Sequence, residues 1–532
     1  MRSARRRMVD VAFVDDETGS PADDVRSGAG APGSLGPPSP PSDRRIAWNR
    51  GARRWWPAAV GLALILVTTS VVAEQRERDR MADLAGVPGV VTTLGDTVTE
   101  KWRTGDGPYS VLGTSTGLLI GTLDRADGSE AVVGLDANSG NPIWEVPVRP
   151  AGDVTNATQC TAPTEATQDP AGVDVVVCVL AAGTENETAT AAGDPSLPAT
   201  ANLLVLDATD GTVLLAEPTD PSTTVSSAGP NLVIGQVLSD GRYQVSRRSA
   251  WDTPARWTFT TPEPLDVDEF GHRSAQVFAT GDLVQVESWS MSTGGGARSS
   301  WVLAADGTAL RSPAATDSGG YGVGFTVLRH GQLLVASGST AGTAYATLTD
   351  LATGSLFRVD ASPFDPWPDD GSLDSLILAH SLTGDDLLAH DLAAERTLWT
   401  VPSPGSSGAM VIDGRVIWAE ANRLVSIDGR TGETVWSTPI NKPSTATDQS
   451  PASTDESSTS THTYVSASTS TFTDGRVVLL ASSDATRPLR LAAYRLDNGV
   501  ELWESTLPTG VWLDEVAGEL YGQSEHGLLA LG

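Results

Sequence analysis

The sequence LVSIDGRTGETVWST, residues 424–438, sets the pattern for most of this chain. Its first half is a short apolar run that ends at Asp428, whose side chain can cap a following turn. Gly432 supplies the positive φ that such a turn needs. β-Branched and aromatic residues around Trp436 then form a returning strand. A third strand is expected at residues 414–418, so the unit is a small antiparallel sheet that cannot bury both faces alone.

Imperfect copies of this stretch recur along the chain, often at intervals of about 40 residues, which is the period of propeller blades. Some copies are degenerate: Leu215 stands where Trp436 stands in the reference copy, and Glu395 replaces the turn glycine. The copies occupy residues 135–144, 206–215, 243–257, 299–311, 349–357, 390–399, 424–436 and 494–503.

The two ends of the repeat region complement each other. Residues 517–531 resemble the first strands of another blade but stop before a tryptophan strand. Residues 97–104 resemble that missing strand alone, with Trp102 in the tryptophan position. We therefore predict a closed ring, because pairing of the first strand with the last blade removes the exposed edges of an open array.

The pattern A/L-x-D-x-x-x-G-x-x-x-W resembles that of the pyrrolo-quinoline quinone (PQQ) repeat family of β-propellers, over roughly residues 96–532. In that family the tryptophan packs between adjacent blades. Members include quinoprotein dehydrogenases and non-enzymatic relatives, such as the lipoprotein that helps to assemble outer-membrane barrels, so the resemblance implies the fold more than the function. The same inter-blade role is implied here for Trp102, Trp144, Trp257, Trp399, Trp436 and Trp503.

The blade count follows from the copies. Eight internal copies and the closing blade give nine candidates, one more than the family usually shows. One of these candidates, a degenerate copy within residues 231–312, is interpreted as not forming a blade of its own and is therefore not counted. We therefore predict an all-β propeller of eight blades, with seven or nine as the alternatives.

The N-terminal part differs from the repeats. Residues 1–54 are rich in Gly, Pro and Ser and are expected to be a disordered cytoplasmic tail. Residues 57–73 carry no charge and follow several arginines, which predicts a transmembrane helix over residues 55–74 with the propeller outside the cell. A signal peptide cleaved after Ala73 and a buried core helix are the alternatives. The expected stem and linker span residues 75–95, and the charged residues 74–83 are expected to be helical.

Charge restricts the partners. The net charge of −31 repels nucleic-acid phosphates, so we expect no nucleic-acid binding. The expected localisation is the cell membrane, with a single pass and a cytoplasmic N-terminus. A Ser/Thr-rich insertion at residues 443–471 cannot pack a core and is expected to be a solvated loop on the rim of the propeller.

The cysteines argue against a quinoprotein enzyme. Quinoprotein alcohol dehydrogenases of the resembled family place a disulfide between adjacent cysteines against the cofactor, beside a bound Ca²⁺ and a catalytic Asp. Cys160 and Cys178 are the only cysteines here and are not adjacent. We expect them to form a disulfide that holds the loop at residues 161–172, with a free thiol as the alternative. We expect no catalytic residue, no cofactor site and no PQQ.

Metal ligands are also not expected. The histidines have no metal-ligand spacing and are interpreted as surface or blade-packing residues. Two acidic clusters could in principle hold Ca²⁺, but turn residues in an acidic protein explain them equally well. These clusters are Asp124, Asp127 and Glu130, and Asp369, Asp370 and Asp374.

Two classes of function remain. The preferred one is a non-catalytic platform at the cell envelope that binds a protein or ligand on the face of the propeller. The alternative is a sensor for a small ligand or quinone, or a degenerate oxidoreductase, that uses the central channel. A cavity with convergent polar groups and an aromatic floor would favour the alternative.

Overall fold

The computed structural model describes most of residues 68–532, and the chain divides into two units, Met1–Glu74 and Gln75–Gly532. The predicted tail, residues 1–54, lies outside the described residues. Beyond residue 67, the following are also not described: residues 70, 93, 96, 106, 152–157, 163–174, 183–199, 229–230, 251–253, 269–270, 272, 291–296, 312–323, 329–331, 341–342, 382–383, 404–407, 421, 441–467 and 484–487.

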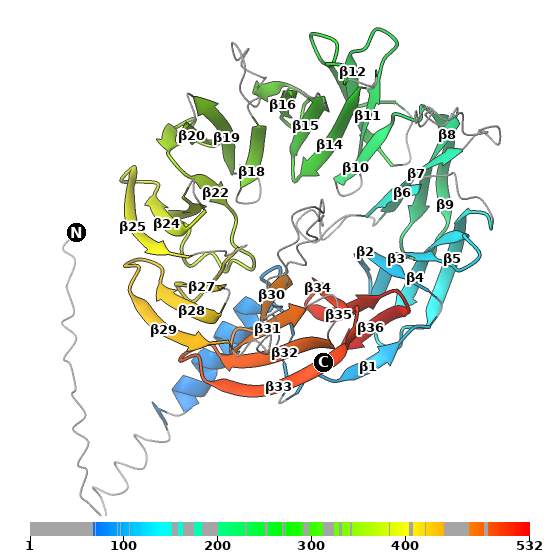
Figure 1. Ribbon diagram of the computed structural model, residues 1–532. Helices are drawn as coiled ribbons and strands as arrows, with labels where there is room; N and C mark the ends of the chain where they lie inside the picture. Colours follow the sequence, from blue (N-terminus) through cyan, green and yellow to red (C-terminus); the bar gives the residue numbers. More distant parts are fainter. Residues whose placement is uncertain are drawn as a thin grey trace, which may run out of the picture. The chain divides into compact units, whose positions relative to one another are not determined.

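The second unit is a ring of nine antiparallel sheets, each with four described strands (Figure 1). Blade 1 consists of β2 (Tyr109–Ser115), β3 (Leu118–Asp124), β4 (Glu130–Asp136) and β5 (Pro142–Arg149). Blade 2 consists of β6 (Thr158–Thr161), β7 (Val175–Ala182), β8 (Thr200–Asp207) and β9 (Val213–Thr219). Blade 3 consists of β10 (Thr224–Ala228), β11 (Asn231–Val237), β12 (Tyr243–Ser249) and β13 (Trp257–Thr260).

The next three blades follow in chain order. Blade 4 consists of β14 (Ser274–Thr280), β15 (Leu283–Ser290), β16 (Ala297–Leu303) and β17 (Ala309–Arg311). Blade 5 consists of β18 (Gly324–Leu328), β19 (Leu333–Thr340), β20 (Thr343–Asp350) and β21 (Leu356–Val359). Blade 6 consists of β22 (Ser362–Phe364), β23 (Leu376–His380), β24 (Asp386–Asp391) and β25 (Arg396–Pro402).

The last three blades complete the ring. Blade 7 consists of β26 (Met410–Ile412), β27 (Arg415–Ala419), β28 (Arg423–Asp428) and β29 (Thr434–Pro439). Blade 8 consists of β30 (Ser468–Thr473), β31 (Val477–Ser483), β32 (Pro488–Arg495) and β33 (Glu501–Thr509). Blade 9 consists of β34 (Trp512–Val516), β35 (Glu519–Ser524), β36 (Gly527–Leu531) and the first strand of the chain, β1 (Glu100–Arg103).

The blade count corrects the prediction of eight. Residues 231–312, where one copy was discounted, contribute to two sheets, blades 3 and 4. In blade 3, β12 and β13 pair although the connection between them lacks the motif Asp and Gly. In blade 4, Asp306 accepts a hydrogen bond from the Thr308 amide at 2.9 Å, and Gly307 adopts a φ of 82°. Strand pairing therefore persists where the sequence motif has decayed.

The two ends of the repeat region meet as predicted. β1 pairs antiparallel with β36, with Trp102 opposite Ala530. The amide and carbonyl of Thr99 exchange two hydrogen bonds of 3.0 Å with those of Gly532. Blade 9 is thus assembled from both ends of the propeller, and the ring has no free edge at this position.

The reference turn has the geometry that its sequence indicates. The Asp428 carboxylate accepts hydrogen bonds from the amides of Arg430 and Thr431 at 3.0 and 2.9 Å. Gly432 follows with a φ of 75°. In blade 6 the equivalent position is Glu395, which adopts a φ of 51°, a conformation that is unfavourable for a residue with a side chain.

The motif tryptophans join neighbouring blades. The Trp436 indole of blade 7 donates a hydrogen bond of 2.9 Å to the Leu496 carbonyl of blade 8 and covers Gly499. A Cβ on Gly499 would lie 2.5 Å from that ring, so the site requires glycine. The equivalent contacts are Trp102 on Gly140, Trp144 on Gly211, Trp257 on Gly307 and Trp399 on Gly432.

Trp503 is the exception among the six predicted tryptophans. It packs at the edge of the core that blades 8 and 9 share. The fourth strand of blade 9 is β1, which comes from the other end of the repeat region, so β36 is not followed by a motif turn. Trp503 therefore has no glycine turn to cover.

The structure has a helix at residues 71–84, where a charged helical stem is expected at residues 74–83. Residues 84–98, which we call the strap, however pack against the propeller and are not a free linker. Five of its apolar side chains are buried: Leu84, Val90, Val91, Leu94 and Val98. Its amides also bond the turns of two blades, from Val91 to the Thr473 carbonyl at 2.9 Å and from Thr92 to the Gly518 carbonyl at 2.5 Å.

The predicted localisation is not supported. Within the part of the chain that the structure describes, no helix is both long enough and apolar enough to cross a membrane. The prediction of a single-pass membrane protein with a transmembrane helix over residues 55–74 is therefore contradicted. Most of that segment lies outside the described residues.

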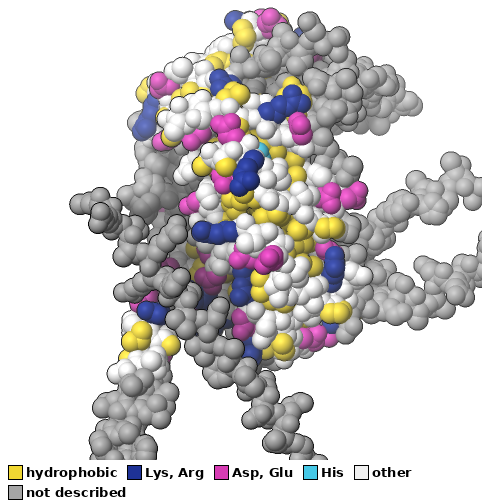
Figure 2. Space-filling view, turned by 90° about the vertical axis from the view of Figure 1, so that its left-hand side faces the viewer, with side chains coloured by type: hydrophobic (Ala, Val, Ile, Leu, Met, Phe, Trp, Pro, Cys, Tyr) yellow, Lys and Arg dark blue, Asp and Glu magenta, His cyan; other side chains and the backbone are white. Residues whose placement is uncertain are grey.

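The surface carries charges of both signs. On the face shown in Figure 2, basic and acidic side chains alternate over the described atoms. Several large apolar side chains are exposed on the outer strands, including Leu356 of β21 and Val435 of β29. Single exposed residues of this kind are normal on a soluble surface and do not define a binding site.

Candidate functional site

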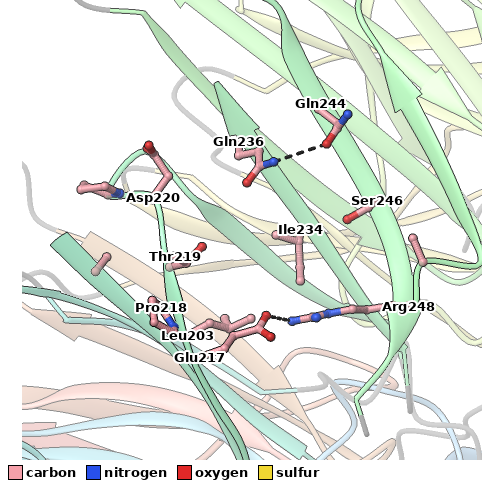
Figure 3. Close-up of a pocket in the computed structure, with 13 residues that line it drawn as sticks. Leu203, Glu217, Pro218, Thr219, Asp220, Ile234, Gln236, Gln244, Ser246 and Arg248 are labelled. Carbon is pink, nitrogen blue, oxygen red and sulfur yellow. Dashed lines mark hydrogen bonds and ion pairs between the residues drawn. The ribbon is translucent and has the colours of Figure 1, made fainter. Parts of the chain in front are cut away.

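The junction between blades 2 and 3 differs from the motif junctions. Leu215 of β9 replaces the tryptophan, and blade 3 lacks the Asp–Gly turn that a tryptophan would cover. A cavity of about 660 Å³ lies between these blades (Figure 3). Its volume is within the usual range of ligand pockets. We call it the groove, and its lining is Ala201, Leu203, Glu217, Pro218, Thr219, Asp220, Pro221, Ile234, Gln236, Gln244, Ser246, Arg248 and Ala255.

Strand alternation places the polar lining. On β12, Gln244, Ser246 and Arg248 are alternate residues and face blade 2, because successive side chains of a strand point to opposite faces. The intervening residues Tyr243 and Val245 pack in the core with blade 4. One face of β12 therefore builds the core and the other supplies the groove.

An ion pair crosses the groove. Arg248 of β12 donates from Nη2 to the Glu217 carboxylate of β9, and Figure 3 shows the two side chains reaching toward each other. Arg248 is only 6% exposed, and its Nε has no hydrogen-bond partner among the described residues. A buried donor that no protein group satisfies is uncommon in native proteins, so this guanidinium can take a further acceptor.

Two glutamines lie further along the groove. Gln236 of β11 donates from Nε2 to the Gln244 Oε1 at 3.3 Å. Each side-chain amide carries both donors and acceptors, and this bond uses only one of each. The apolar side chains of Ile234 and Pro218 are accessible in the groove, whereas Leu203 lies beneath it in the core. The site thus combines hydrogen-bonding groups with apolar contact area.

The polar groups of the groove are hydrogen-bond donors and acceptors. Its lining holds no His, Cys or Lys, and the Asp220 carboxylate accepts hydrogen bonds from the amide and hydroxyl of Ser222. The Glu217 carboxylate is engaged by Arg248. These residues can accept and donate hydrogen bonds, but they do not form a nucleophile and base pair.

A second cavity, of about 430 Å³, lies at the ends of the inner strands of blades 4 to 6. Trp367 forms part of its wall and is 51% exposed. The Trp367 amide donates to the Ala409 carbonyl at 2.9 Å, which fixes this segment against blade 7. Three carboxylates also line this cavity: Asp365, Asp369 and Asp374.

The two cysteines form a disulfide. Cys160 of β6 and Cys178 of β7 are directly opposite each other, with their Cα atoms 4.1 Å apart. The bond therefore joins the first two strands of blade 2. The loop that it was expected to hold, residues 161–172, lies largely outside the described residues.

The acidic clusters serve local structure. Asp124 pairs with Arg149 at 2.9 Å, and Glu130 contacts the same guanidinium at 3.4 Å. Asp370 accepts hydrogen bonds from the amides of Ser372 and Asp413, at 3.0 and 2.6 Å. Among the described residues, no group of three or more His, Cys, Asp or Glu side chains is placed to hold a metal ion.

Two histidines pack within and beside blade 6. His380 stacks on Phe364 with ring centroids 4.6 Å apart, and His390 stacks on Phe357 of blade 5 at 5.8 Å. Burial lowers the pKa of both imidazoles. His526 is exposed, and His272, His330 and His462 lie outside the described residues.

His390 should make the propeller sensitive to mild acid. Its pKa is lowered in the folded state by burial, whereas an unfolded histidine titrates near 6.5. The free energy of unfolding is therefore unaffected by this histidine at high pH. It decreases as the pH falls below about 6.5, by at most about 1.4 kcal/mol per pH unit for one group. We expect His390→Leu to reduce the slope of unfolding free energy against pH between pH 7 and 5. His526→Leu is the control, and an equal reduction in both variants contradicts the assignment.

The fold is a nine-bladed β-propeller, and comparison with known proteins finds a PQQ-type repeat in part of it. Residues 383–517 match the PQQ_2 family model, described as outer membrane protein assembly factor BamB. This match spans parts of blades 6 to 9. No protein of curated function matches the chain in sequence.

Two solved structures illustrate the neighbours. BamB from Moraxella catarrhalis is 14% identical and has a TM-score of 0.36, and the alignment covers 71% of this chain and 97% of BamB. The quinohemoprotein alcohol dehydrogenase ADHIIG from Pseudomonas putida HK5 is 13% identical and has a TM-score of 0.38, with 85% of this chain and 81% of the enzyme covered. One neighbour is an assembly factor and the other an enzyme, so these likenesses do not decide the function.

Proposed function

We propose that this protein is a non-catalytic β-propeller that binds another protein, with the groove between blades 2 and 3 as its contact site. The groove supports this proposal because it holds a partly buried ion pair, a buried donor on Arg248 that no described residue satisfies, and apolar contact area. Such a mixture provides affinity and orientation without acid–base chemistry. A rigid ring also holds the two walls of the groove at a fixed separation.

PQQ, the cofactor that the repeat family implies, does not fit the residues present. Adjacent cysteines would be needed to stack a disulfide on its ring. The only two cysteines of the chain are bonded to each other across β6 and β7. We therefore assign no step to this cofactor in the proposed function.

Site-directed photo-crosslinking would test the proposed function. The full chain would carry benzoylphenylalanine at Thr219 in the groove or at Leu356 of β21, which is 60% exposed. In the cells that make this chain, we expect one protein adduct from position 219 and none from position 356. The captured protein, once purified, should bind the unmodified chain with a measurable Kd. No adduct from position 219, together with a rise in melting temperature on adding PQQ, would overturn the proposal.

A second candidate is the binding of a small ligand in the cavity at Trp367. It is favoured by the half-exposed indole and the carboxylates that line this cavity. A cationic aromatic compound such as N-methylquinolinium can be used as a probe, because its charge suits the carboxylates of this cavity and a ligand stacked on Trp367 should quench its fluorescence. Loss of that quenching in Trp367→Leu, but not in Trp512→Leu, would support this candidate.

A further inference from the structure

The charge in the groove restricts what can bind there. Glu217 and Asp220 contribute two negative charges, whereas Arg248 contributes one positive charge that Glu217 already neutralises. A ligand with several carboxylates would therefore be repelled. The acceptor that Arg248 Nε lacks is better supplied by a neutral carbonyl oxygen.

The glutamine pair indicates how such carbonyls would be arranged. In the Gln236–Gln244 bond, one side chain donates from its nitrogen and the other accepts on its oxygen. This leaves Oε1 of Gln236 as an acceptor and Nε2 of Gln244 as a donor. A peptide main chain offers N–H and C=O groups in alternation, and each can pair with a side-chain amide. The groove is therefore complementary to main-chain amides.

The outer edge of blade 2 is not suited to adding a strand. β9 is the edge strand of its sheet, and it contains Pro218 and is followed by Pro221. Proline has no N–H to donate, and it blocks the pairing of a further strand at an edge. A bound segment would thus lie between the facing sheets, in contact with the groove side chains, and would not extend the blade 2 sheet.

From these contacts we infer that the groove binds an extended, non-acidic peptide segment that is recognised mainly through its main-chain amides. This inference rests on the proposed function and specifies the class of its ligand. A carbonyl of the segment accepts from Arg248, and its amides pair with Gln236 and Gln244. An apolar side chain of the segment packs on Ile234 and Pro218, which lie in the same groove.

Peptide selection would test this inference with a defined probe. A phage-displayed library of random linear peptides of twelve residues would be selected on the purified full chain, and calorimetry would give the affinity of the selected peptides. We expect Thr219→Trp, which fills the groove, to weaken binding at least tenfold. Leu356→Trp on blade 5 is the matched control and should bind as the unsubstituted chain does. Arg248→Lys should also weaken binding, because lysine lacks the Nε donor.

Variants of the selected peptide test main-chain recognition. Methylation of single backbone nitrogens should weaken binding at two or more positions by at least tenfold, whereas most alanine substitutions should have smaller effects. Added Asp or Glu should also weaken binding. Thermal unfolding of Thr219→Trp and Arg248→Lys would establish that both variants remain folded, and Gln244→Ala provides a milder substitution in the same wall.

The outcomes separate this inference from the proposed function. Selected peptides that bind Thr219→Trp as tightly as the unsubstituted chain would overturn the inferred site but leave protein binding intact. If alanine variants of the peptides lose affinity while their N-methyl variants still bind, main-chain recognition would be overturned. Failure to select any peptide would overturn the peptide class, and the crosslinking experiment would still decide whether a protein is bound.

Discussion

Replacing Trp436 by alanine is expected to lower the free energy of unfolding by about 4 kcal/mol, because a buried indole is removed and a cavity remains. The indole is 8% exposed and belongs to the buried hydrophobic cluster that blades 7 and 8 share. The substitution also deletes the hydrogen bond to the Leu496 carbonyl and uncovers Gly499. Both blades therefore lose contacts at once, and urea unfolding followed by near-UV circular dichroism would measure the effect.

Trp512→Ala is the matched control for this prediction. Trp512 belongs to β34 and is 49% exposed, so its removal should change the free energy of unfolding by less than about 1 kcal/mol. Equal effects of the two substitutions would show that the motif tryptophan has no special role between blades. A larger decrease in the free energy of unfolding for Trp436→Ala would support the role of Trp436 in joining blades 7 and 8.

The sequence predicted the features that depend on local chemistry. Asp428 and Gly432 indicated a capped turn, and the structure has that turn with the expected φ. Residues 517–531 lack the last strand of a blade, and the strand around Trp102 has no blade of its own in the sequence. Together they predicted ring closure, and the structure has it. Both features can be predicted because a turn requires particular residue types at fixed positions, and an unpaired edge strand requires a partner.

The blade count was harder to predict, because sheet formation tolerates loss of the motif. β12 and β13 pair although their connection lacks the Asp and Gly of the motif turn. Pairing depends on the alternation of buried side chains such as Tyr243 and Val245, and not on the turn residues. Both degenerate copies within residues 231–312 are visible in the sequence, and the prediction falls one blade short because one copy is discounted to match the usual count of the resembled family.

The groove was missed for a related reason. Its components lie on strands separated in sequence, from Leu203 to Arg248, and only the ring brings them together. One sequence signal was available: Gln244, Ser246 and Arg248 occupy alternate positions of a strand whose other face is buried. A polar face directed at a neighbouring blade, next to the missing tryptophan at Leu215, indicates an incompletely filled junction.

Removing the strap and β1 is expected to have the largest effect of all. The strap buries Leu84, Val90, Val91, Leu94 and Val98 against the propeller. Burial of five such side chains contributes about 10 kcal/mol as an upper estimate, which is comparable with the whole stability of a typical domain. A chain that begins at residue 75 should retain cooperative unfolding, whereas a chain that begins at residue 99 should melt at a much lower temperature. A chain that begins at residue 104 also lacks β1 and should not unfold cooperatively.

A single substitution in the full chain tests the same contact without truncation. Asp474 is 1% exposed and accepts hydrogen bonds from the amides of Leu94, Arg476 and Val477 at 3.0, 2.8 and 2.8 Å. Asp474→Ala leaves these donors without their acceptor and should cost about 3 kcal/mol. Amide hydrogen exchange should then rise in the strap before it rises in blade 3, because the strap loses its anchor at blade 8. Asp497→Ala, at an exposed carboxylate, is the control, and faster exchange spread evenly over all blades would refute a specific role for the strap.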